Sequence, residues 1–199
     1  MKNSTLTYKL LKPFVVIFTR LLWKVTFLNN QVIPKKGGAL IVGNHSSWID
    51  TLLLTSASIK RPIWFFTGEF ILKVPFMGSL VRQLCIIPVD NKQGKLAIEQ
   101  AIEKIKAGHV VCIFPEGELT RTGDLLRFRK GVAVIQKATN VPVIPFFITG
   151  GYDAWSYKEK TPKFFRNITV NFGEPFCPQA EKENDIANEI KEIVISLKK

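Results

Sequence analysis

Short apolar runs alternate with longer amphipathic segments over most of this chain. The short runs are almost wholly apolar, as are strands that are buried on both faces of a sheet. The longer segments repeat their apolar residues at helical spacing. We predict strands at 39–42, 63–66, 85–89, 110–114, 141–147 and 168–172, and helices at 92–106, 129–139 and 185–198. This alternation predicts an α/β fold with a mostly parallel sheet that helices cover on both faces.

The first segment, residues 8–27, is strongly apolar but carries four cations. On a helix, Lys9, Lys12, Arg20 and Lys24 gather on one side and the apolar residues on the other. A helix that spans a bilayer needs about 20 mostly uncharged apolar residues, which this segment lacks. We therefore expect an amphipathic helix that lies in the membrane interface. A helix packed on its own domain is the alternative.

Length and composition fit one domain behind that helix. The chain has 199 residues, of which 46% are hydrophobic, enough for one sizeable core. We divide it into a membrane-associating helix at 1–30 and an α/β domain at 31–199. Its three cysteines are odd in number and widely spaced, which indicates a reducing compartment. The N-terminus also lacks the cleavage site of a secretory signal.

The chain is strongly basic, with 28 Lys and Arg against 16 Asp and Glu and a formal charge of +12. Such a surface attracts an anionic partner: nucleic acid, a phosphorylated metabolite or anionic lipid. The sequence has no RNP-like or zinc-finger pattern, and several cations flank an apolar helix. We therefore expect an anionic membrane surface as a partner, and no nucleic acid.

The stretch "LIVGNHSSWID" at 40–50 ends an apolar strand in a histidine, with an aspartate five positions later. On one helix, His45 and Asp50 would point about 140° apart. If His45 instead lies in the turn before the helix, Asp50 can hold one ring nitrogen while the other faces outward. That pair would be a general base with its orienting partner. A histidine that caps its own helix is the alternative.

The remaining polar residues near this stretch have simpler interpretations. We expect Ser46 or Ser47 to cap the helix rather than act as a nucleophile, because no G-x-S-x-G elbow is present. His109 begins an apolar strand without further ligands at suitable spacing, so we predict a structural histidine and no metal site.

A second motif, "FPEGELTRTG" at 114–123, follows another predicted strand. A strand that runs into a loop with hydroxyls and cations can present N–H groups and arginines to a phosphate ester. Arg127, Arg129 and Lys130 follow soon after. The loop lacks the known nucleotide-binding patterns. A solvated polar turn is the alternative.

These motifs together resemble those of the glycerolipid acyltransferases, the family of 1-acylglycerol-3-phosphate acyltransferase. Asn44-His45 with Asp50 matches the NHxxxxD motif, residues 114–117 match FPEG, and "VPVIPFFI" at 141–148 resembles the fourth motif. The resemblance covers roughly residues 20–175. It implies that His45 is the catalytic base and that Asp50 orients it.

The resemblance also implies a substrate site and a reaction. Glu116 and Gly117 would shape a glycerol-phosphate pocket, and we expect Asn44, Thr120 and Arg121 to contact substrate as well. The reaction would move a fatty acyl group from an acyl-carrier-protein or coenzyme A thioester to the hydroxyl of a lysophospholipid, in phospholipid biosynthesis or remodelling. A thioester is already activated, so we expect neither cofactor nor metal.

With the interfacial helix, we expect a peripheral or monotopic enzyme at the cytoplasmic face of the cell membrane. A thioester hydrolase with the same residues, in which water replaces the acceptor, is one alternative. A catalytically inactive basic lipid-binding protein is the other.

Two departures from the family pattern concern the acceptor. Glu118 and Leu119 stand between the FPEG motif and Arg121. Asn91, followed by Lys92, stands at a position where another family motif, between NHxxxxD and FPEG, usually has an arginine. The form FPEGxxTRTG is closer to the acyltransferase part of acyl-carrier-protein synthetase/2-acylglycerophosphoethanolamine acyltransferases. A phosphodiester carries one negative charge and needs fewer cations, so a lysophosphatidylethanolamine-like acceptor is a hypothesis beside lysophosphatidate. Earlier in this same family motif, which lies between NHxxxxD and FPEG, Glu69, Pro75 and Gly78 follow the family pattern.

Overall fold

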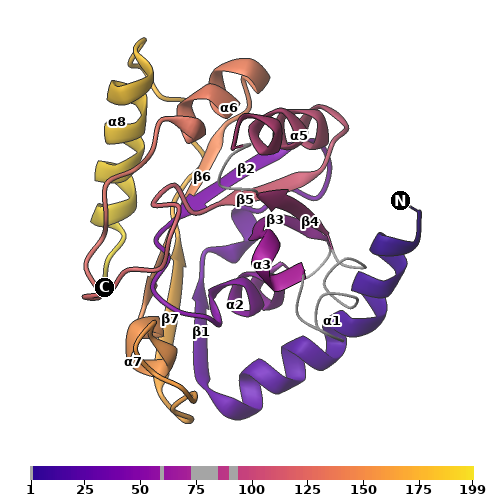
Figure 1. The fold of residues 1–199 in the computed structure, drawn as a ribbon, viewed down its shortest axis with the longest axis vertical. Coiled ribbons are helices and arrows are strands. Elements are labelled where there is room, and N and C mark those ends of the chain that lie inside the picture. Colours follow the sequence, from indigo (N-terminus) through magenta and orange to yellow (C-terminus); the bar gives the residue numbers. More distant parts are fainter. Residues whose placement is uncertain (1, 59–60, 73–84, 90–93) are drawn as a thin grey trace.

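The computed structural model describes residues 2–58, 61–72, 85–89 and 94–199, and it has an α/β fold around one seven-stranded sheet (Figure 1). The strands are β1 (Lys24–Leu28), β2 (Ala39–Gly43), β3 (Ile63–Gly68), β4 (Ile86–Val89), β5 (Val110–Ile113), β6 (Val143–Thr149) and β7 (Asn167–Phe172). Their order in the sheet is β1-β7-β6-β2-β5-β3-β4. All neighbours are parallel except β6 and β7. The predicted, mostly parallel sheet is therefore confirmed.

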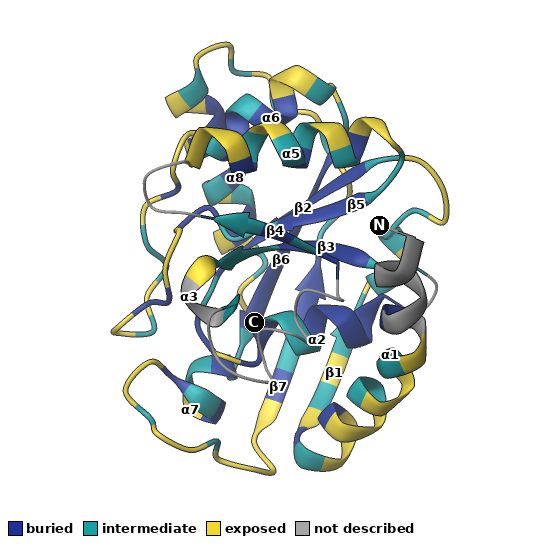
Figure 2. Cartoon of the chain, turned by 45° about the vertical axis from the view of Figure 1, so that its right-hand side comes forward, coloured by how far each residue is buried: buried dark blue, intermediate teal, exposed yellow. Residues whose placement is uncertain are grey.

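Helices cover both faces of this sheet, as the alternating pattern predicted. They are α1 (Lys2–Leu22), α2 (Asp50–Ala57), α3 (Glu69–Leu72), α5 (Gly94–Lys106), α6 (Gly131–Thr139), α7 (Gly151–Trp155) and α8 (Glu183–Ser196), with a 3₁₀ turn at Asn30–Val32. Figure 2 shows α5, α6 and α8 on one face, and α2 with α1 outside it on the other.

The central strand β2 shows why the sheet needs two covered faces. Leu40 and Val42 pack into the cluster under α5, α6 and α8, and Ala39 and Ile41 pack into the cluster under α2. All five residues of β2 are buried, so the strand has no polar side to offer solvent. The strand ends at Gly43, the last buried position before the polar turn.

The N-terminal segment differs from its prediction at one end. The helix predicted over 8–27 is confirmed as far as Leu22, but residues 23–27 are not helical, because Lys24–Leu28 form β1. This strand pairs in parallel with β7 and forms an edge of the sheet. The alternation of exposed Lys24 and Thr26 with more buried Val25 and Phe27 was an available signal. Pairing with β7 outweighs the helical periodicity that continues from α1.

Several residues of the family motif between NHxxxxD and FPEG lie outside the described part of the chain. Pro75, Gly78, Asn91 and Lys92 lie outside the described residues, while Glu69 begins α3 and is exposed.

Among the described residues, the structure has no helix with the length and hydropathy needed to cross a bilayer.

Candidate active site

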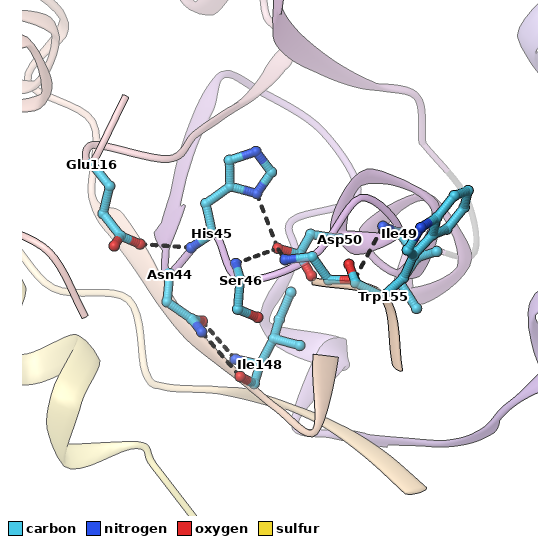
Figure 3. A network of polar contacts seen from close by, with 9 residues as sticks. Asn44, His45, Ser46, Ile49, Asp50, Glu116, Ile148 and Trp155 are labelled. Carbon is cyan, nitrogen blue, oxygen red and sulfur yellow. Dashed lines mark hydrogen bonds and ion pairs between the residues drawn. The ribbon is translucent and has the colours of Figure 1, made fainter. Parts of the chain in front are cut away.

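The histidine and aspartate of the first motif meet at the carboxyl end of β2. Residues 44–49 form the turn into α2, and His45 Nδ1 lies 3.0 Å from Asp50 Oδ2 (Figure 3). The side chain of Asp50 is fully buried, whereas that of His45 is 23% exposed. With the carboxylate as acceptor, Nδ1 carries the proton, and the lone pair of Nε2 points away from Asp50. The turn therefore folds back as the spacing predicted.

Asp50 also organises the backbone of this turn. Its Oδ2 accepts the N–H groups of Ser46, at 2.7 Å, and Ser47, at 2.9 Å. The N-cap residue of α2 is Ile49 and not a serine, so the predicted serine cap is not formed. Ser47 Oγ reaches only the N–H of Ile49, at 3.4 Å, which lies before the helix. A charged carboxylate is a stronger acceptor than a hydroxyl. One oxygen thus fixes both the turn and the histidine ring.

The serine hydroxyls have other surroundings. Ser47 Oγ donates to the carbonyl of Trp155 in α7, at 2.8 Å. Ser46 Oγ is buried without a partner among the described residues. Within that part of the chain, neither hydroxyl is hydrogen-bonded to the imidazole. This placement does not make either serine a nucleophile activated by His45.

An aromatic stack fixes the plane of the His45 ring. The ring lies on Phe114, with centroids 4.1 Å apart and planes inclined by 13°. Phe114 packs edge-on against Phe146, which fills the space that a side chain at Gly43 would need. Sequence reasoning assigned no role to Phe114. Its place as the last residue before Pro115, at the end of the neighbouring strand, was the available signal.

Asn44 ties the same turn to the next strand. Its Nδ2 donates to the carbonyl of Ile148, at 3.0 Å, and its Oδ1 accepts the N–H of Ile148, at 2.7 Å. The residue is buried and both ends of its amide are bonded to the backbone of β6. These contacts position the turn. A direct contact of Asn44 with substrate stays a prediction.

Glu116 of the FPEG motif connects its loop to the turn that carries His45. Its two carboxylate oxygens accept the N–H groups of His45, at 2.6 Å, and Leu126, at 2.7 Å. The Thr120 N–H in turn donates to the His45 carbonyl, at 3.1 Å. Burial raises the pKa of the Glu116 carboxyl, and the two N–H bonds oppose that shift. Glu116 thus braces the loop from 114 to 126 against His45.

Gly117 brings this loop close to an arginine. Its φ is +76°, and a side chain there would begin 2.7 Å from the guanidinium of Arg129. Arg129 also lies 3.9 Å from Glu118 in an exposed pair, which contributes little to stability. The guanidinium of Arg129 therefore lies against Gly117, the residue after Glu116. Most of the Arg129 side chain faces solvent.

The other predicted substrate residues occupy different environments. Thr120 is buried, and its Oγ1 accepts the N–H groups of Thr122 and Gly123 within the loop. Arg121 is exposed, with its guanidinium 5.3 Å from the centre of the Tyr157 ring. Arg127 and Lys130 are also exposed, and Lys130 lies 3.8 Å from Glu183 of α8. Arg121 and Arg127 are therefore the cations of this group that are placed to meet an anion from solvent.

The second histidine lies at the other end of the sheet. His109 precedes β5, and its ring is 5.6 Å from that of Trp64. Its burial and the nearby Lys104 and Arg61 lower its pKa. The described residues contain no group of three or more His, Cys, Asp or Glu side chains suited to a metal ion.

Comparison with known proteins identifies the class that this fold and site define. The model of the Acyltransferase family matches residues 24–149, which is more than half of the chain. The chain belongs to the Acyltransferase family, and it is an acyltransferase, as the two motifs predicted.

Individual relatives carry a more specific name. A probable 1-acyl-sn-glycerol-3-phosphate acyltransferase of Mycoplasma pneumoniae is 27% identical, over 85% of this chain and 70% of the relative. The Pseudomonas aeruginosa 1-acyl-sn-glycerol-3-phosphate acyltransferase is 29% identical, over 87% of this chain and 68% of its own. The crystal structure of the 1-acyl-sn-glycerophosphate acyltransferase PlsC from Thermotoga maritima superimposes with a TM-score of 0.81 and 26% identity, covering 94% of this chain and 76% of that one.

Proposed function

We propose that this acyltransferase moves a fatty acyl group from a thioester to the free hydroxyl of 1-acylglycerol-3-phosphate, in phospholipid synthesis. The observation that carries this proposal is the His45–Asp50 pair, in which Nε2 points away from Asp50 and has no partner among the described residues. The loop with the exposed Arg121 is bonded to the same turn through Glu116. The names of the relatives support the choice of acceptor.

In this mechanism, His45 Nε2 takes the proton of the acceptor hydroxyl while its oxygen attacks the thioester carbonyl. The new C–O bond forms, the C–S bond breaks, and the proton passes from the imidazolium to the departing thiolate. Asp50 keeps Nδ1 protonated and stabilises the imidazolium, as the aspartate of a catalytic triad does. The substrate supplies the nucleophile, so no covalent acyl-protein intermediate is needed.

Arg121 in the FPEG loop and Arg129, which follows that loop, are suited to the acceptor phosphate. A phosphate monoester carries up to two negative charges, and guanidinium groups bind such anions through paired hydrogen bonds. Arg129 lies against Gly117, directly after the residue that is bonded to the His45 backbone. Arg121 is an exposed residue of the same loop. We assign Arg129 and Arg121 to this phosphate.

The acceptor and the donor are tested together in one assay panel. With either acyl-carrier-protein or coenzyme A thioesters, we expect transfer to lysophosphatidate to be faster than to lysophosphatidylethanolamine, because the monoester offers more charge to the arginines. Release of thiol without acceptor is measured in parallel. A preference for lysophosphatidylethanolamine would contradict the assigned acceptor, and thiol release that is independent of acceptor would identify a hydrolase instead.

We propose further that α1 docks on the membrane interface. The side chains of Leu10, Phe14, Ile17, Phe18 and Leu21 are 52–70% exposed. The inner side of α1 is mixed, with Tyr8 buried in the core and Leu22 packed against it. It also carries polar contacts: Thr19 is buried with its hydroxyl 2.8 Å from that of Ser56 in α2, and Lys12 donates to the carbonyl of Ser58. Packing on the domain therefore covers only part of the apolar surface of this helix. A bilayer would cover the apolar side that α1 leaves exposed (Figure 2).

Charged substitutions on α1 test this docking. We expect the variant Phe14→Glu/Phe18→Glu to move from the membrane fraction to the supernatant, because glutamates cannot enter the apolar boundary and repel anionic lipid. The matched control is Ile195→Glu on α8, an exposed apolar residue on the other face of the sheet. Substitution is preferable to deletion of residues 1–27, which would remove most of β1. Unchanged sedimentation of the double variant would contradict the docking.

The cytoplasmic face suits this placement. The odd number and wide spacing of the three cysteines favour a reducing compartment, and both candidate donors are cytoplasmic molecules. An acidic carrier protein would also be attracted to the charge of +12.

A further inference from the structure

A second exposed apolar element lies in the loop between α7 and β7. Phe164 and Phe165 are adjacent in sequence, and they are 46% and 69% exposed. Isolated apolar residues are common on protein surfaces, but two adjacent phenylalanines beside another apolar surface need an explanation. That other surface is the outer side of α1.

Three hydrogen bonds attach this loop to the end of α1. The N–H of Phe165 donates to the carbonyl of Leu22, at 2.6 Å, and the N–H of Lys24 donates to the carbonyl of Arg166, at 3.0 Å. Trp23 Nε1 donates to the carbonyl of Lys163, at 2.9 Å. Figures 1 and 2 both show the loop beside the junction of α1 and β1, at the lower end of the molecule.

Aromatic contacts make the two apolar surfaces continuous. The buried ring of Trp23 lies between them, with its centroid 6.3 Å from that of Phe18 in α1 and 5.9 Å from that of Phe164 in the loop. Phe18, Trp23 and Phe164 thus form one row that leads from the outer side of α1 to the loop.

The backbone at Phe165 is unusual. Its φ is +60°, a left-handed conformation that is strained for a bulky side chain and is usual for Gly or Asn. The fold does not offset this strain by burying the ring, because the ring is among the most exposed aromatics of the described chain. A ring that is held outward at a conformational cost is consistent with a contact outside the molecule.

Cations surround this combined surface. Arg20, Lys24, Lys160 and Arg166 are exposed, and their side chains have no hydrogen bond or ion pair within the part of the chain that the structure describes. Arg20 and Lys24 line an open cavity of about 410 Å³ beside β1 and β7. By contrast, Lys163 is paired with Glu159, at 2.8 Å. An aromatic surface with unpaired cations at its border is suited to an anionic bilayer.

This surface lies at the same end of the sheet as the catalytic turn, the end at which β2 and β6 terminate. Because β6 and β7 are antiparallel, β7 begins where β6 ends, with Thr149 paired to Thr169. β1 begins there too, with Lys24 paired to Asn167. His45 follows the carboxyl end of β2, which is the parallel neighbour of β6. The loop, the end of α1 and His45 therefore all lie at this one end of the sheet.

We propose that the α7–β7 loop, residues 156–166, is a second membrane-contact element that inserts Phe164 and Phe165 into an anionic bilayer beside α1. This inference rests on the proposed docking of α1 and adds its orientation. A single helix on the surface leaves the protein free to rotate about the helix axis, whereas a second contact at its end removes that freedom. The catalytic turn is then held toward the lipid surface that contains the acceptor.

The loop is also connected to the catalytic turn through α7. The carbonyl of Trp155 accepts the N–H of Trp48, at 3.2 Å, and the hydroxyl of Ser47, at 2.8 Å. Next to the two phenylalanines, near the end of the loop, Lys163 donates its N–H to the carbonyl of Ala154 in α7, at 2.7 Å. One short helix thus links the membrane-contact loop to the residues that surround His45.

The test measures sedimentation with vesicles made of equal parts phosphatidylglycerol and phosphatidylcholine. We expect Phe164→Gln/Phe165→Asn to lower the partition coefficient roughly 10-fold, since two aromatic side chains no longer enter the bilayer. Acyl transfer to a short-chain, water-soluble lysophosphatidate should be unchanged. Phe165→Asn alone retains the contact of Phe164 with Trp23 and suits the left-handed backbone, so it remains informative if the double variant does not fold. Leu96→Gln, an exposed residue of α5, is the matched control.

The outcomes separate this inference from the docking of α1. If Phe164→Gln/Phe165→Asn binds like wild type while Phe14→Glu/Phe18→Glu does not bind, the loop proposal is wrong and the docking of α1 stands. If neither variant changes binding, both are wrong. Equal affinity for vesicles of phosphatidylcholine alone would overturn the role of the cations. Normal vesicle binding with a loss of activity only for carrier-protein thioesters would show that the loop binds a protein instead.

Discussion

Replacing His45 by alanine is expected to lower kcat for acyl transfer by ~10²–10⁴-fold, the usual contribution of a general base. Nδ1 of the imidazole is held by Asp50, whereas Nε2 points away from Asp50 and has no hydrogen-bond partner among the described residues. Without that nitrogen, the acceptor hydroxyl must lose its proton to water as it attacks. KM for the acceptor should change much less than kcat, because the loop arginines remain.

The matched control for this variant is His109→Ala. His109 lies at the opposite end of the sheet, before β5, and should leave kcat at the wild-type value. The melting temperature of both variants shows whether the fold is intact. A His45→Ala protein that folds normally and retains wild-type kcat would contradict the mechanism, whereas membrane binding by a fully inactive variant would be consistent with it.

Replacing Asp50 by asparagine is expected to reduce kcat by ~10²–10⁴-fold, because a neutral amide cannot stabilise the imidazolium that forms when His45 takes the proton. One carboxylate oxygen, Oδ2, accepts Nδ1–H of His45 and the N–H groups of Ser46 and Ser47. We expect the amide oxygen of the variant to take that position, because the amide nitrogen cannot accept these three hydrogen bonds. The turn and the ring orientation should then persist, while the negative charge behind the ring is lost.

The control for Asp50→Asn is the same substitution at Asp185, an exposed residue in the first turn of α8. Asp185→Asn should leave kcat unchanged. NMR of imidazole labelled with ¹⁵N reports which nitrogen carries the proton, and it should show the proton still on Nδ1 in the variant. Wild-type kcat in Asp50→Asn would contradict the role of the carboxylate charge, and a proton moved to Nε2 would show that the amide nitrogen faces the ring instead.

The difference between the predicted and the observed site follows the distance between partners along the chain. The His45–Asp50 contact joins residues five positions apart, so the turn and its spacing are enough to predict it. Glu116 reaches the His45 backbone from 71 positions away, and Asn44 reaches Ile148 across 104. These contacts exist because β5 and β6 flank β2 in the sheet. Sequence reasoning treated both side chains as substrate contacts because it could not show that backbone groups already bind them.

The sequence by itself determined the buried parallel strands, the amphipathic first helix and the local geometry of the catalytic turn. All of these depend on periodicity or on neighbours within a few residues, which the chain specifies directly. Only the tertiary structure decided that α1 buries Thr19 but leaves Phe14 and Phe18 exposed, that Lys24–Leu28 form a strand that pairs with β7, and that Phe114 stacks on His45. The physical reason is that a hydrophobic pattern shows that a side will be covered, but the packing of distant elements determines what covers it.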